Sequence, residues 1–124
     1  MIARRFATVL GAFLLIEGIW GLFSPVVFGV LTTNLLHAVI HIALGVTGLL
    51  AARSAAASKY LMFVGAILLV VGILRFVPGA SDLVVSLLNV NVAVAWVNII
   101  VGAAALIVSM TDKNPGTAQE VDSR

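Results

Sequence analysis

A few polar side chains inside otherwise apolar stretches are the residues of this sequence that could do chemistry. Glu17 interrupts the first apolar run, and His37 and His41 stand four residues apart in the second. This spacing places both imidazoles on one face of a helix, as in helical zinc sites. With Glu17 as a third ligand, the two histidines would form a site with an open position, a composition that suits zinc or non-haem iron.

Each of these residues also has a purely structural interpretation. The two imidazoles can hydrogen-bond to neighbouring backbone or asparagine groups and so join helices. An acid inside a membrane span costs at least about 2.5 kcal/mol on insertion scales, so Glu17 needs either a function or a partner. We expect Glu17 to be either protonated or paired with Arg75, which lies about one helical turn from its level. The other members of the predicted polar cluster are Asn34, Asn91 and Asn98.

We predict no cofactor, with a divalent metal at the Glu17, His37 and His41 side chains as the alternative. Haem is disfavoured because its axial ligands approach from opposite faces, which two histidines on one helix face cannot do. The chain has no cysteine, which excludes disulfides, thiolate metal sites and cysteine nucleophiles. No Ser/His/Asp set has a recognisable arrangement, so we predict no catalytic residues and no enzymatic activity.

The composition is that of a chain dissolved in lipid. Of the 124 residues 62% are hydrophobic and only 10% are charged, and the mean hydropathy is +1.22. A soluble domain of this length carries about a quarter charged residues. The formal net charge of +2 is too small to indicate a nucleic-acid partner.

Four apolar stretches are long enough to cross a membrane as helices, which needs about 20 residues each. The predicted spans lie at 4–23, 34–52, 58–77 and 90–109. They predict a single four-span membrane domain over residues 1–110, followed by a polar cytoplasmic tail at 111–124.

The two halves of the chain resemble each other. Residues 11–19 and 65–73 are identical at six of nine positions. The second and fourth stretches align at an offset of 57, which matches Asn34 with Asn91 and His41 with Asn98. We therefore predict an all-α, polytopic membrane four-helix bundle, built from a tandem repeat of two-helix hairpins. Small residues at helical spacing are expected to form its seams. They are Gly11, Gly18, Gly45, Gly48, Gly65, Gly72 and Gly102.

Basic residues predict the orientation of the chain, because they favour the cytoplasmic side. One side carries Arg4, Arg5, Arg53, Lys59, Lys113 and Arg124. The other side carries only Arg75, so both termini are predicted to face the cytoplasm. The uncharged Ser24–Thr33 loop is expected at the headgroup interface. In the other outer loop, Ser81 or Asp82 is expected to cap a short apolar segment.

The second stretch carries a family resemblance. The pattern N-x-x-H-x-x-x-H-x-x-x-G-x-x-G-L, from Asn34 to Leu49, resembles that of the bacterial membrane proteins grouped as domain of unknown function 4383. The resemblance extends to about Ser109. It implies four spans and a bacterial cytoplasmic (inner) membrane, and it brings no established activity. The family pattern has a histidine in its second half, where this chain has Asn98, which weakens any proposal of two symmetric histidine sites.

Three classes of function remain open. The first is a structural or accessory subunit, with the lipid bilayer and either a second copy of the chain or a larger membrane complex as its partners. The second is a metal-binding or redox membrane protein that uses Glu17, His37 and His41. The third is a proton-coupled transporter that uses Glu17, similar to the small multidrug resistance exporters. Those exporters lack the histidine motif and have little charge bias between their sides.

Overall fold

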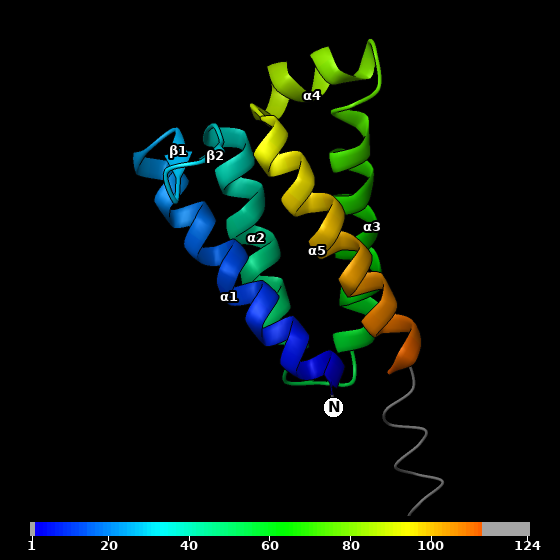
Figure 1. Ribbon diagram of the computed structural model, residues 1–124. Helices are drawn as coiled ribbons and strands as arrows, with labels where there is room; N and C mark the ends of the chain where they lie inside the picture. Colours follow the sequence, from blue (N-terminus) through cyan, green and yellow to red (C-terminus); the bar gives the residue numbers. More distant parts are fainter. Residues whose placement is uncertain (1, 113–124) are drawn as a thin grey trace, which may run out of the picture.

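The computed structural model describes residues 2–112, which form five helices with short connections (Figure 1). The helices are α1 (Ile2–Phe23), α2 (Leu35–Ala51), α3 (Ala57–Leu74), α4 (Ala80–Leu88) and α5 (Val92–Thr111). The predicted helical class is confirmed. Beyond Thr111 and Asp112, the predicted tail lies outside the described residues, as do Lys113 and Arg124.

Three of the described helices, α1, α3 and α5, are long and apolar enough to cross a membrane, which indicates a membrane protein. They contain 22, 18 and 20 residues. Helix α2 is also apolar, but it has 17 residues and is the shortest of the four long helices. Figure 1 shows these four helices running alongside one another, with α4 lying across one end.

Helix α1 packs along α2, and α3 packs along α5 (Figure 1). Glycines allow the two helices of each pair to pack closely together. A Cβ atom added to Gly45 would lie 2.6 Å from the backbone nitrogen of Leu15 in α1. A Cβ atom added to Gly102 would lie 2.7 Å from the backbone nitrogen of Leu69 in α3. Both distances are shorter than real Cβ contacts, so a side chain at either glycine would force the backbones apart.

The other predicted packing glycines also lie at helix contacts. Gly11 and Gly18 face α2, and Gly65 and Gly72 face α5. Gly48 differs, because an added Cβ would meet the Tyr60 ring instead of a helix backbone. The space left at Gly48 admits this ring, and the Tyr60 hydroxyl donates a 2.6 Å hydrogen bond to the carbonyl oxygen of Leu44. This contact joins α3 to α2.

The connections that precede α2 and α5 both contain regular secondary structure. The Ser24–Thr33 loop contains a two-stranded antiparallel hairpin, β1 (Val26–Val27) and β2 (Leu31–Thr32). The other connection leads into α4, which begins after Gly79 at a φ of 85°. The predicted caps at Ser81 and Asp82 were wrong. Both residues lie inside α4, because the positive φ of Gly79 lets the chain turn into the helix earlier.

The buried apolar residues form two clusters. One joins α1, α2, α3 and α5 toward the chain's N-terminal end and includes Leu14 and Leu68. The other joins the hairpin, α4 and α5 and includes Val84 and Val94.

Candidate functional site

An asparagine caps the N-terminus of the second helix in each pair. Asn34 precedes α2, and its side-chain oxygen accepts a hydrogen bond from the His37 backbone N–H at 2.9 Å. Asn91 precedes α5 and accepts from the Val94 N–H at the same distance. Each side chain therefore satisfies one of the N–H groups that a helix start leaves without a partner.

The same two asparagines also connect the two halves of the chain. The Asn34 amide nitrogen donates to the carbonyl oxygen of Leu87 at 2.8 Å. The Asn91 amide nitrogen donates to the carbonyl oxygen of Val30 at 2.9 Å. Each helix start is thus bonded to the segment that precedes the other one, which is the last turn of α4 for Asn34 and the hairpin turn for Asn91. We call this reciprocal pair of bonds the asparagine latch.

Two residues that the sequence analysis did not single out reinforce the asparagine latch. The Thr32 hydroxyl donates to the Asn89 carbonyl oxygen at 2.6 Å and accepts from the Asn91 backbone N–H at 3.0 Å. The Asn89 side chain donates to the Thr33 carbonyl oxygen at 2.8 Å. Thr32 and Asn89 are themselves 57 residues apart, so extending the internal alignment by two positions would have found both.

Arg75 also bonds to the segment between α3 and α5. Its Nε donates to the Val90 carbonyl oxygen at 2.8 Å, and one terminal nitrogen donates to the Ser81 hydroxyl at 3.1 Å. The predicted pairing of Arg75 with Glu17 was wrong. The arginine lies at the end of α3, where its guanidinium reaches the Ser81 hydroxyl in α4 and the Val90 carbonyl oxygen just before α5.

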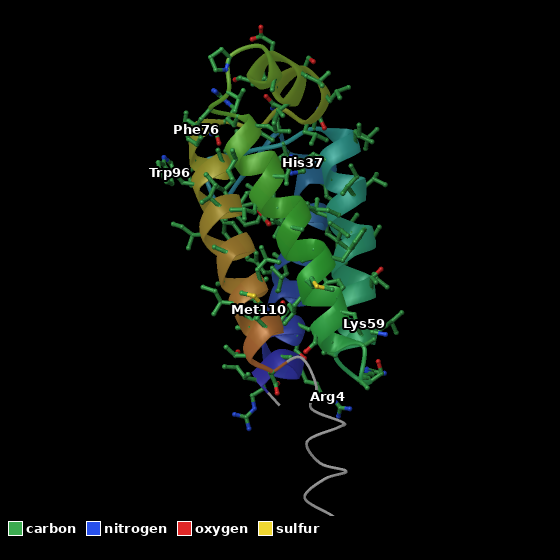
Figure 2. All side chains as sticks on the ribbon, turned by 90° about the vertical axis from the view of Figure 1, so that its right-hand side faces the viewer. Arg4, His37, Lys59, Phe76, Trp96 and Met110 are labelled. Atoms are coloured by element: carbon green, nitrogen blue, oxygen red, sulfur yellow. The ribbon has the colours of Figure 1, made fainter. Side chains whose placement is uncertain are left out.

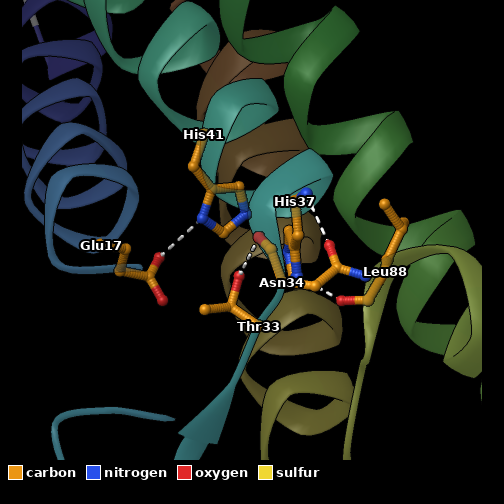
Figure 3. Close-up of polar contacts among 6 residues, drawn as sticks. All are labelled: Glu17, Thr33, Asn34, His37, His41 and Leu88. Carbon is orange, nitrogen blue, oxygen red and sulfur yellow. Dashed lines mark hydrogen bonds and ion pairs between the residues drawn. The ribbon is translucent and has the colours of Figure 1, made fainter. Parts of the chain in front are cut away.

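The two histidines lie next to each other on α2 but face different partners (Figure 3). Nδ1 of His37 is 2.9 Å from the carbonyl oxygen of Leu88, the last residue of α4. A carbonyl oxygen only accepts, so Nδ1 carries the hydrogen, and Nε2 of the neutral ring is an acceptor. The rings of His37 and His41 meet edge to face, with centroids 4.3 Å apart.

Glu17 and His41 face each other across the contact between α1 and α2, as Figure 3 shows. The carboxylate oxygen lies 3.6 Å from Nδ1 of the imidazole, and the two side chains are 9% and 7% exposed. This separation is too long for a direct hydrogen bond, so the two side chains are neighbours across the helix contact. The intramembrane acid of α1 therefore has a polar partner on α2, its closest neighbouring helix.

The three predicted metal ligands come together only in part. Glu17 approaches His41, whereas the His37 Nδ1 is engaged by the Leu88 carbonyl oxygen. Within residues 2–112, no group of three His, Cys, Asp or Glu side chains is arranged to hold a metal ion. Asn98, the remaining member of the predicted cluster, lies buried on α5. Its side chain has no hydrogen-bond partner among the residues that the structure describes.

The contact between Glu17 and His41 should appear as a coupling energy. We expect Glu17→Leu and His41→Leu each to destabilise the protein, and the double variant to lose about 1 kcal/mol less than the sum. Reversible unfolding in mixed detergent micelles measures the three free energies. As a control, Glu17→Leu combined with Arg75→Met should give additive losses, because these side chains have separate partners. Additivity for Glu17 with His41 would contradict the contact.

Comparison with known proteins identifies a family that this chain matches. The family model described as Domain of unknown function (DUF4383) matches residues 4–111, which is most of the chain. Neither a curated protein nor a solved structure matches it.

Proposed function

Since the chain belongs to the DUF4383 family of unknown function, we propose a role from the use of its polar residues. It is an integral membrane protein that acts as an accessory or assembly subunit of a larger membrane complex. The observation that carries this proposal is the set of bonds made by Asn34, Asn91 and Arg75. Each of these side chains binds backbone carbonyl oxygens that join separate segments. Groups used in this way stabilise a scaffold and are not available to a substrate.

The proposed architecture of this subunit is a tandem repeat of two hairpins with four spans. Equivalent contacts in the two helix pairs support the repeat. An added Cβ would lie 2.7 Å from the Ala38 oxygen at Gly18 and 2.7 Å from the Ala95 oxygen at Gly72. Helix α2 is the proposed fourth span. Its 17 residues correspond to about 26 Å at 1.5 Å per residue, close to the thickness of a thin bilayer.

The proposed location is a bacterial cytoplasmic membrane, with both termini on the cytoplasmic side. Figure 2 supports the orientation, because Arg4 and Lys59 lie at one end of the molecule and His37 lies toward the other. Basic residues near the first end favour the cytoplasm.

Cysteine labelling in intact cells tests this orientation, since the chain contains no cysteine. Ala55→Cys, in the exposed connection between α2 and α3, should stay unlabelled by a membrane-impermeant maleimide. Ser86→Cys, on exposed α4, should react. The reverse pattern would place the termini outside.

The accessory role is tested in native membranes. The tagged chain, extracted in a mild detergent, should migrate on a native gel in one discrete complex larger than the purified chain. Deleting its gene should lower the abundance of the other members of that complex, and re-expression should restore them. A chain that migrates as a monomer or homo-oligomer, with an unchanged membrane proteome after deletion, would refute the role.

A further inference from the structure

A cavity of about 220 Å³ lies between α2, α3 and α5, beside the last residue of α4. Most of its lining is aliphatic and includes Leu68 and Val71. His37, His41 and Asn98 are its polar lining residues. Apolar cavities with a few converging polar groups are the usual form of a small-molecule site. The polar side chains are therefore positioned to orient a ligand while the aliphatic wall holds its apolar part.

Asn98 provides the strongest indication of a ligand. Its side chain is buried, with 6% exposure, lines the cavity, and has no hydrogen-bond partner within residues 2–112. An amide that lines a cavity and has no hydrogen-bond partner of its own can bond to a molecule held there. The neighbouring polar lining residues come from α2, whereas Asn98 comes from α5, so a molecule between them would bond to both helices.

The volume of the cavity and the position of the hydrogen on the His37 ring limit which ligands can bind. An apolar protein cavity of about 150 Å³ holds one benzene molecule, so this cavity can hold a substituted six-membered ring. The His37 Nδ1 is directed at the Leu88 carbonyl oxygen, which leaves Nε2 as an acceptor that needs a donor. The Asn98 amide can donate. A hydroxyl group both donates and accepts, whereas the oxygens of a quinone only accept.

We propose that this cavity binds the ring of a small, neutral, membrane-soluble phenol. The hydroxyl donates to an imidazole nitrogen and accepts from the Asn98 amide, while the ring packs against Leu68 and Val71. This site goes beyond the accessory role, which requires no ligand. It also differs from the 260 Å³ hollow lined by Phe6, Phe13 and Val101, which has only apolar lining and cannot favour a hydroxyl group.

The test uses 4-fluorophenol, with fluorobenzene as the matched ligand without the hydroxyl. Fluorine NMR measures the binding of each to the full-length protein in detergent micelles. Val71→Phe fills the cavity from α3, and Asn98→Leu removes the amide but keeps a side chain of similar size. Val39→Phe, on the exposed face of α2, is the control for adding a phenyl ring elsewhere.

We expect one saturable site per chain for 4-fluorophenol in the unmodified protein and in Val39→Phe. Val71→Phe should abolish it. Asn98→Leu should weaken 4-fluorophenol binding about five- to tenfold, the effect of losing one buried hydrogen bond, without changing fluorobenzene binding. Equal binding of the two ligands to the unmodified protein, or equal 4-fluorophenol binding to the unmodified protein and a folded Val71→Phe, would overturn the proposal. If Val71→Phe does not fold, an unchanged preference for 4-fluorophenol in Asn98→Leu overturns it as well.

Discussion

Gly45→Ala and Gly102→Ala are each expected to lower the free energy of unfolding by about 2 kcal/mol. The new methyl groups would lie 2.6 Å and 2.7 Å from the backbone nitrogens of Leu15 and Leu69. Backbone atoms cannot move aside as a flexible side chain does, so each pair of helices must separate. Overpacking of this kind costs about 3 kcal/mol, of which the better helix propensity of alanine recovers about 1 kcal/mol.

Reversible unfolding in mixed micelles measures these losses. Ala43→Val, on the exposed face of α2, is the matched control, because it adds apolar volume toward lipid. It should change stability by less than about 0.5 kcal/mol. The two glycine variants should lose similar amounts, since they occupy corresponding positions in the two helix pairs. Losses no larger than that of the control would show that the pairs are not held at glycine contacts.

Asn34→Ala and Asn91→Ala should each cost about 2 kcal/mol, because each removes two different interactions. The helix cap contributes about 1 kcal/mol. The hydrogen bond from the side-chain amide to the Leu87 or Val30 carbonyl oxygen contributes about another 1 kcal/mol. Serine at the same positions retains a capping oxygen but is too short to donate across the latch. Asn34→Ser and Asn91→Ser should therefore lose only about half as much.

Hydrogen exchange distinguishes the latch from the cap. In Asn34→Ser, the amides of residues 87–91 should exchange faster, although these residues are more than 50 positions away in the chain. In Asn91→Ser, the faster exchange should appear at residues 30–33. Ser86→Ala, which removes a hydroxyl bonded only within α4, is the control and should leave both loops unchanged. If exchange rises only around the substituted residue, the asparagines act as caps alone.

The polar residues show which side-chain contacts the sequence could predict and which it could not. Spacing placed His37 and His41 on one helix face, and the structure shows their rings in contact. Spacing also suggested Arg75 as the partner of Glu17, but Glu17 meets His41 and Arg75 binds Val90 and Ser81. Long side chains reach whichever partner the helix packing and the loop backbone bring near, and periodicity within one helix does not specify either of these.

Composition and the lengths of the apolar stretches were sufficient to predict a helical membrane protein, because burial in lipid leaves helices as the means of satisfying the backbone. The caps at Asn34 and Asn91 are also local, since a capping oxygen bonds an N–H three residues away, although the sequence analysis placed both residues only in the polar cluster. The tertiary structure decided which carbonyl oxygens the asparagine amides bind, how α4 meets His37, and that a cavity surrounds Asn98. These features depend on residues far apart in the chain, and the hydrogen bonds among them join residues 51 to 61 positions apart. Their positions follow from the way in which one helix pair packs against the other. No local sequence pattern specifies this packing.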